Sequence, residues 1–147
     1  MGLRVAVVGA TGAVGTEMLR ILDSRAFPVD ELVPLASARS AGRTIPFRGG
    51  DVQIRELSLD AFRGVDLSLS AAGASVARGF VRQAAAGGTV CIDKSSAFRM
   101  EPDVPLVIPE VNPEALEGSP HLIAVPNCTT IVAMMALAPL HRAAGLC

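Results

Sequence analysis

The sequence predicts an α/β protein built on a doubly wound, mostly parallel sheet. Short apolar segments alternate with amphipathic segments along the chain, a pattern typical of strands joined by crossover helices. A glycine-rich segment also follows the first apolar run and precedes the first helical pattern, as in the βαβ unit that binds nucleotides. Half of the 147 residues are hydrophobic, which is enough to bury a core.

The first predicted unit is a strand, a glycine turn and a helix. Residues 3–8 form a short apolar run of the kind that is buried in parallel sheets. Glycines in the segment 9–15 allow a tight turn and a close backbone approach to a pyrophosphate, while the helix N-terminus supplies N–H donors. This predicts a Rossmann-like nucleotide site, although the G-x-x-G-x-x-G spacing leaves an ordinary tight turn as the alternative. The predicted inner face of the helix consists of Val14, Met18, Ile21 and Leu22.

The second predicted strand, residues 31–36, ends in Ser37-Ala38-Arg39-Ser40. An NAD site usually carries Asp or Glu at this point, to bind the ribose 2′-hydroxyl. A guanidinium and neighbouring hydroxyl groups instead suit a 2′-phosphate, because arginine donates to it as a bidentate fork. The loop therefore favours NADP over NAD, and the alternative is that Arg39 is a solvated loop residue.

A hairpin is predicted next, with strands at 44–47 and 52–55 around a Gly49-Gly50-Asp51 turn. We expect it to be an excursion from the main sheet. A strand at 65–69 follows and ends in Ser70-Ala71-Ala72-Gly73. Small residues there let a ligand approach the carboxyl edge of the sheet.

A further helix and several strands complete the predicted sheet. The helix spans residues 75–86, and the strand at 89–92 contains Cys91, which we expect to be an inert core residue. The loop 93–100 then lies on the ligand side and carries Arg99. Anion binding and an ordinary surface position explain this arginine equally well. The remaining expected elements are a strand at 106–108, a brief helix near 113–117 and a last strand at 121–125.

A polar Asn-Cys-Thr-Thr cluster interrupts the apolar sequence at 127–130. If a helix begins at Cys128, the sulfur lies near N–H groups at the positive end of the helix dipole, which favours the thiolate. A base is still needed, and His121 and His141 are each separated from Cys128 by about 20 Å of strand or helix. Either the catalytic partner lies elsewhere or Cys128 is a helix-start core residue.

The helix that follows the cysteine is apolar on almost every side up to residue 140. Helices of this kind belong inside a larger structure, and Pro139 is expected to kink or end this one. We therefore expect the chain to be a truncated part of a longer protein.

Composition excludes several classes of partner. A net charge of −1 and the absence of Trp and Tyr argue against nucleic acid and anionic membranes. Three cysteines do not form a disulfide framework, so we expect a cytoplasmic protein that acts on a small-molecule substrate. No membrane span and no metal site is predicted.

Four motifs, taken in order, resemble the N-terminal part of the aspartate-β-semialdehyde dehydrogenase family. They are Gly9-Ala10-Thr11-Gly12-Ala13-Val14-Gly15, Ser37-Ala38-Arg39-Ser40, Ser95-Ser96-Ala97-Phe98-Arg99-Met100 and Pro126-Asn127-Cys128-Thr129-Thr130. The resemblance extends over essentially the whole chain. It implies a reversible, NADP-dependent reductive dephosphorylation of L-aspartyl-4-phosphate to L-aspartate 4-semialdehyde, in the biosynthesis of lysine, methionine and threonine.

The resemblance also implies a division of the chain and a set of residue roles. Residues 1–127 would form the NADP-binding domain, and residues 128–147 the start of a truncated substrate and dimerisation domain. Cys128 would form an acyl-thioester with the substrate, Asn127 would hold the substrate or orient the thioester, and Arg99 would bind phosphate. Contacts with NADP would come from Gly9, Thr11, Gly12, Ala13, Val14, Ser37, Arg39, Ser40, Ser70, Ala71 and Gly73.

Part of the site would lie outside this chain. The acid/base His, a substrate-binding Gln and Arg, and the contacts of a homodimer or dimer of dimers would come from the following domain. This piece alone is therefore expected to be inactive. Lys94 stands where the family commonly has Asn, so any cofactor contact there is open.

Two other functions are compatible with the motifs. An N-acetyl-γ-glutamyl-phosphate reductase would use the same chemistry, but its cysteine usually sits in a Gly-Cys-Tyr-Pro setting. A non-catalytic NADP-binding module would need no reactive cysteine.

Overall fold

The protein is built on a six-stranded sheet with the strand order β5-β2-β1-β6-β7-β8. The structure, a computed structural model, describes residues 2–146. Every pair of neighbouring strands in this sheet is parallel, which confirms the predicted doubly wound α/β class. The strands are β1 (Leu3–Val8), β2 (Val29–Ala36), β5 (Arg55–Glu56), β6 (Leu67–Ser70), β7 (Val90–Asp93) and β8 (Leu122–Ala124).

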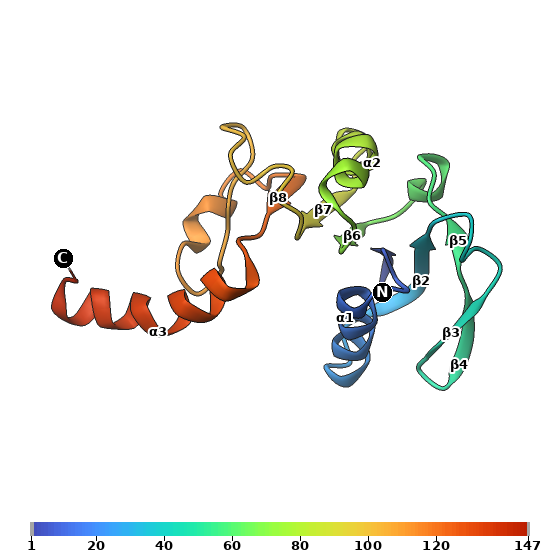
Figure 1. The fold of residues 1–147 in the computed structure, drawn as a ribbon, viewed down its shortest axis with the longest axis horizontal. Helices are drawn as coiled ribbons and strands as arrows, with labels where there is room; N and C mark the ends of the chain where they lie inside the picture. Colours follow the sequence, from blue (N-terminus) through green and yellow to red (C-terminus); the bar gives the residue numbers. More distant parts are fainter. Residues whose placement is uncertain (1, 147) are drawn as a thin grey trace.

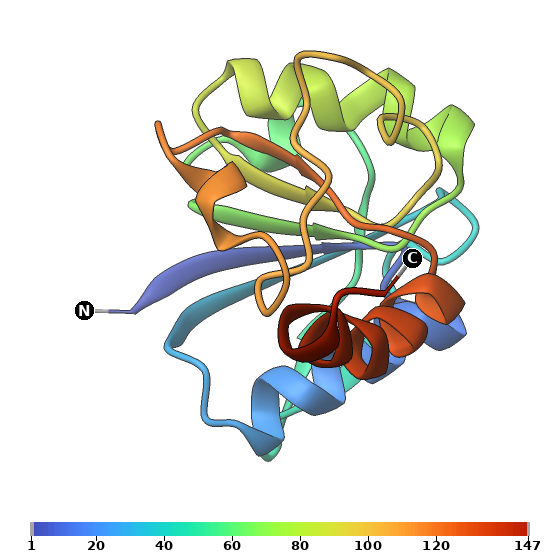
Figure 2. The same ribbon diagram turned by 90° about the vertical axis from the view of Figure 1, so that its left-hand side faces the viewer.

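Two helices cover opposite faces of this sheet, α1 (Ala13–Ser24) and α2 (Ala74–Ala86). Figure 1 and Figure 2 show the sheet between them. Successive residues of a strand point to opposite faces, so β1 contributes to two cores. Val5 and Val7 pack in the cluster that contains Leu19 of α1, whereas Ala6 and Val8 pack in the cluster that contains Val81 of α2.

The buried face of α1 differs from the predicted one. Gly15, Leu19 and Leu22 are buried, while Val14 and Ile21 are 47% and 39% exposed. The helix is turned so that Gly15 lies against the turn after β1, where an added Cβ would come within 2.2 Å of the Gly9 carbonyl oxygen. Of the predicted face, Leu22 is buried and Met18 packs against the core, as expected, whereas Val14 and Ile21 point outward. Backbone contact at Gly15 turns the helix in this way, so counting apolar residues identifies only part of the inner face.

The predicted hairpin exists as a separate antiparallel pair, β3 (Thr44–Phe47) and β4 (Gly50–Gln53). The turn between them is Arg48-Gly49 and not Gly49-Gly50-Asp51. Arg48 and Gly49 have positive φ angles of 50° and 76°. A two-residue hairpin loop of the favoured hand requires that conformation. Arg55, expected in the hairpin, instead belongs to β5 of the main sheet.

The expected strand at 106–108 is reduced to a single parallel bridge between Leu106 and Ala124. Pro105 and Pro109 flank this segment. Because proline has no N–H to donate, they prevent a longer ladder. The expected brief helix is the 3₁₀ turn Pro113–Leu116, and a second such turn spans Asp60–Phe62.

Helix α3 (Cys128–Ala144) extends away from the sheet (Figure 1). It continues through Pro139 to Ala144 and is capped by Gly145, which has a left-handed φ of 65°, so Pro139 does not end it. Val132 and Leu140 are 73% and 55% exposed, and Arg142 ties the far end of the helix to the carbonyls of Glu110 and Val111. Within residues 2–146, no helix is both long and apolar enough to cross a membrane.

We predict that Gly15→Ala lowers the free energy of unfolding by about 1–3 kcal/mol, because its Cβ would meet the Gly9 backbone. Gly79→Ala is the matched control, since Gly79 lies within α2 and an added Cβ meets no atom within 4 Å. The control should raise the same free energy by about 0.5–1 kcal/mol. Urea unfolding of both variants measures these changes, and a Gly15→Ala variant as stable as the wild type would contradict the packing described.

Candidate active site

The segments predicted to bind ligands meet at the carboxyl edge of the sheet. The turn after β1 is held there by Leu35, whose carbonyl accepts hydrogen bonds from the N–H groups of Gly9 and Ala10 at 2.8 and 3.2 Å. Gly9 has a φ of 80°, and a Cβ there would lie 3.3 Å from the backbone of Ala71 and Ala72. The glycine therefore lets the turn after β1 approach the end of β6, at the point where the strand order reverses and α/β proteins bind ligands.

The first turns of α1 and α2 suit an anion. Their N-caps are Gly12 and Gly73, which have no side chain to bond the first N–H groups, and neither first turn contains an acidic residue. Residues 11–14 are all exposed at this position. Unbonded N–H groups at a helix N-terminus bind phosphate well, so the two helix starts fit a dinucleotide pyrophosphate.

The loop after β2 presents its arginine to solvent. Arg39 and Ser37 are exposed, and the Arg39 guanidinium has neither an ion pair nor a hydrogen bond within the described residues 2–146. Ser40 is 7% exposed, and the loop end is fixed by bonds from Gly42 N–H to Ile54 C=O and from Ile54 N–H to Arg43 C=O. An unengaged guanidinium on a fixed loop fits a bound phosphate group.

A cavity of about 210 Å³ connects the glycine turn with the cysteine. Three larger cavities, of about 510, 330 and 230 Å³, lie between α1 and the hairpin, along α3 and beside the end of α2, and none of them includes the cysteine. The smaller cavity is the one at which residues of three predicted motifs converge. Its lining residues are Val14, Ala71, Ala72, Lys94, Arg99, Pro126, Asn127 and Cys128.

Cys128 is the first residue of α3 and is exposed. Asn127 caps this helix, because its Oδ1 accepts hydrogen bonds from Thr129 N–H at 2.9 Å and Thr129 Oγ1 at 2.7 Å. The Cys128 thiol is 3.9 Å from the same oxygen. Cys91 is the opposite case: it is fully buried, and burial, with a smaller contribution from the Asp93 carboxylate, raises the pKa of its thiol to about 12. The expectation that Cys91 is a core residue is confirmed, and its inertness stays a prediction.

Arg99 joins two segments of the site, a role that the sequence did not predict. Its Nε donates to the Val125 carbonyl at 3.0 Å, and its Nη2 donates to the Lys94 carbonyl at 2.8 Å. Nη1 takes part in neither bond, and the side chain lines the cavity. Arg99 therefore braces the loop after β7 against the segment that leads to Cys128.

Ser70 lies beneath the edge and not on it. It is fully buried, and its carbonyl accepts a hydrogen bond from Lys94 N–H at 3.0 Å. Ala71 is half-buried and Gly73 is exposed, so these two reach the surface.

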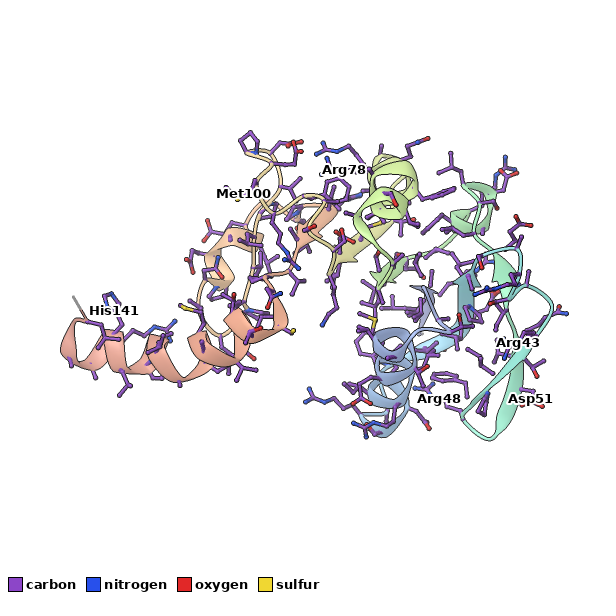
Figure 3. All side chains as sticks on the ribbon, viewed as in Figure 1. Arg43, Arg48, Asp51, Arg78, Met100 and His141 are labelled. Atoms are coloured by element: carbon purple, nitrogen blue, oxygen red, sulfur yellow. The ribbon has the colours of Figure 1, made fainter. Side chains whose placement is uncertain are left out.

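No histidine or carboxylate lines the cavity within the described part of the chain. His141 lies on the part of α3 that extends away from the sheet (Figure 3), and His121 is exposed at the start of β8, near the opposite end of that strand from Cys128. Among residues 2–146 there is also no cluster of three side chains that could hold a metal ion. The cavity is thus lined by a thiol and by two cationic side chains, Lys94 and Arg99, and by no side chain of the described residues that would serve as a general base at neutral pH.

Known proteins match this chain over most of its length. The family described as semialdehyde dehydrogenase, NAD binding domain, matches residues 4–119. This chain is 51% identical to the aspartate-semialdehyde dehydrogenase of Synechocystis sp. over 140 residues and 47% identical to that of Bacillus subtilis over 145 residues. These alignments cover 95% and 99% of this chain but 41% and 42% of those proteins, so the chain spans about two fifths of their length.

Solved structures agree with the fold. The aspartate semialdehyde dehydrogenase II of Vibrio cholerae, complexed with ASA, matches with a TM-score of 0.94 and 44% identity, over 99% of this chain and 48% of that one. The Candida albicans enzyme with NADP matches with a TM-score of 0.79 and 26% identity, again over 99% and 48%. The family match spans most of the residues that form the sheet and the glycine turn, and this chain therefore belongs to the semialdehyde dehydrogenase NAD-binding domain family and is a nucleotide-binding domain.

Proposed function

We propose that this chain is the NADP-binding and nucleophile-bearing N-terminal part of an aspartate-semialdehyde dehydrogenase. One observation carries the proposal: the exposed thiol of Cys128 and the glycine-turn residue Val14 line the same cavity, together with Arg99. A thiol beside a nucleotide site is the arrangement that aldehyde oxidation through a thioester requires. The relatives named above, of which the chain covers about two fifths, support the choice of substrate.

The residues at the carboxyl edge would hold NADP. Residues 11–14 and the first turn of α2, after Gly73, would bind the pyrophosphate through backbone N–H groups, since both helix starts lack a side-chain cap in the described chain. Arg39, with Ser37, would bind the 2′-phosphate. Ser40 and Ser70 would act from beneath the surface, by shaping the loop and the strand end, because both are buried.

Cys128 would carry the reaction as a covalent intermediate. A base first takes the proton of the Cys128 thiol, and the thiolate would then attack the aldehyde carbon of aspartate semialdehyde, which forms a carbon–sulfur bond and the oxyanion of a thiohemiacetal. NADP, when bound, would supply the acceptor for a hydride. As this carbon loses its hydride, the oxyanion forms the carbonyl double bond again and a thioester remains on Cys128. A phosphate oxygen, held by Arg99, attacks the thioester carbon, the carbon–sulfur bond breaks, and aspartyl phosphate leaves as the thiolate is restored.

The proposed activity belongs to the complete protein. No base lines the cavity of residues 2–146, so we place the base on a segment that follows α3. On this proposal residues 1–127 form the cofactor domain and residues 128–147 begin the substrate and dimerisation domain of a homodimeric enzyme. The reactive thiol also favours a reducing compartment such as the cytoplasm.

We predict that iodoacetamide at pH 8 labels Cys128 and leaves Cys91 unmodified in the folded complete protein. Thiolate is the reactive form, and a pKa of about 12 leaves about one Cys91 thiol in ten thousand ionised at that pH. Because burial raises this pKa, Cys91 becomes reactive only as the pH approaches 12 or the protein unfolds. Peptide mass mapping separates the cysteines, and equal labelling of the two in folded protein would contradict both the burial and the enzyme proposal.

We predict that Cys128→Ser in the complete protein lowers phosphate-dependent NADP reduction by aspartate semialdehyde at least about a thousandfold, because the nucleophile is lost. Cys91→Ala is the control and should retain activity within about threefold. Absorbance at 340 nm, a property of the reduced nicotinamide, follows the reaction. A Cys128→Ser enzyme with wild-type turnover would leave the chain as a non-catalytic nucleotide-binding module.

We predict that Arg39→Ala raises the Kd for NADP about 10- to 100-fold and leaves the Kd for NAD unchanged. The reason is the loss of charge-assisted hydrogen bonds that only the 2′-phosphate accepts. Arg25→Ala is the control, since Arg25 is exposed at the opposite end of α1 from the glycine turn. Calorimetric titration of the complete protein with each cofactor measures both constants, and an equal loss for NAD and NADP would show that Arg39 does not read the 2′-phosphate.

A further inference from the structure

The loop after β7 begins with a carboxylate that the proposed mechanism does not use. Asp93 is the last residue of β7 and is fully buried. Its Oδ2 accepts a hydrogen bond from Ser95 Oγ at 2.5 Å, while its Oδ1 has no hydrogen-bond partner within residues 2–146. A buried carboxylate is costly, and one with an unpartnered oxygen more so. No other described strand of the sheet ends in a buried carboxylate, so the fold does not require one at a strand end.

Ser95 links this carboxylate to the loop through two hydrogen bonds. The Ser95 hydroxyl donates to Asp93, and its oxygen accepts a hydrogen bond from Ala97 N–H at 3.0 Å. Ala97 and Phe98 are 4% and 3% exposed and pack in the core on the α2 side of the sheet. The loop is thus held on one side by the core and on the other by the Asp93–Ser95 pair, immediately before Arg99.

Arg99 depends on this loop conformation. Its Nη2 reaches back to the carbonyl of Lys94, which lies between Asp93 and Ser95, and its Nε reaches the carbonyl of Val125. Asp93 also fixes the second segment, because its own carbonyl accepts a hydrogen bond from Val125 N–H at 2.9 Å. The main-chain bond to Val125 N–H does not depend on the residue type at position 93, so the Asp93 side chain acts on Arg99 through Lys94, which its bond to Ser95 encloses.

We propose that Asp93 and Ser95 are positioning residues that hold Arg99 at the cavity, with Asp93 acting as a hydrogen-bond acceptor for the Ser95 hydroxyl. This rests on the proposed function, in which Arg99 binds the attacking phosphate. Without the pair, the loop releases Arg99, and the enzyme binds phosphate less tightly. NADP binding is unaffected, because no residue proposed to contact NADP, including those at the end of β6, contributes an atom to the hydrogen bonds between Asp93, Ser95 and Ala97.

The test uses the complete enzyme and compares the KM for phosphate with the KM for NADP in four variants. Ser95→Ala should raise the phosphate KM about tenfold, the loss expected for one hydrogen bond that orients a charged group. Asp93→Ala should do the same, while Asp93→Asn should stay within threefold of the wild type, because its amide oxygen still accepts the Ser95 hydroxyl. Ser96→Ala is the matched control, since Ser96 is the exposed neighbour, and it should change neither constant.

The two proposals fail in different ways. The positioning role is overturned if Ser95→Ala leaves the phosphate KM unchanged, or if it raises the KM values for phosphate and NADP together. It is also overturned if the Asp93→Asn enzyme behaves like Asp93→Ala. If Asp93→Ala does not fold, Ser95→Ala against Ser96→Ala decides alone. Arg99→Ala is the reference for the function, and it should raise the phosphate KM more than any of the four. A phosphate KM unaffected by Arg99→Ala, or a wild type without phosphate-dependent NADP reduction, overturns both proposals.

Discussion

The structure depends on a contact between two stretches of backbone that only glycine permits. Gly15 in the first turn of α1 lies so close to the Gly9 carbonyl that a Cβ would come within 2.2 Å of the oxygen. Because of this contact α1 begins directly over the end of β1, and its first N–H groups face the carboxyl edge. Val14 then becomes one wall of the cavity whose other walls come from the ends of β6, β7 and β8. The contact between Gly15 and the Gly9 carbonyl is therefore the cause of both the close helix–strand packing and the shape of the site.

The sequence predicted the order and type of most elements because apolar runs and turn residues carry that information locally. The prediction failed where an apolar residue is not part of the core. Val14 and Ile21 are apolar at helical spacing but exposed, and Val14 lines a cavity, so periodicity counted a cavity residue as a core residue. It also overestimated the strand at 106–108, because three apolar residues between two prolines can make only a bridge.

The motifs at the candidate site were recognisable, but their contacts were not. Arg99 and Ser95 stand out in the sequence, yet which carbonyls Arg99 reaches depends on how the loop folds back over Lys94. Likewise, the small residues after β6 indicate a ligand edge, but only the register of β6 with β7 shows that Ser70 is buried beside Asp93. Long-range contacts of this kind depend on packing between elements, and a pattern along one segment does not contain them.

The capping of the three helices separates their proposed tasks. α1 and α2 begin at glycines without a side-chain cap, so their N–H groups stay available to the pyrophosphate. α3 begins at the same edge, but Asn127 occupies the N–H of Thr129. The start of α3 therefore has one fewer free N–H group than the starts of α1 and α2. On the proposed mechanism, binding of the attacking phosphate falls to Arg99, a cation that lines the cavity beside the thiol. The pyrophosphate and the attacking phosphate would then be held by different means, the first by backbone N–H groups and the second by a side chain.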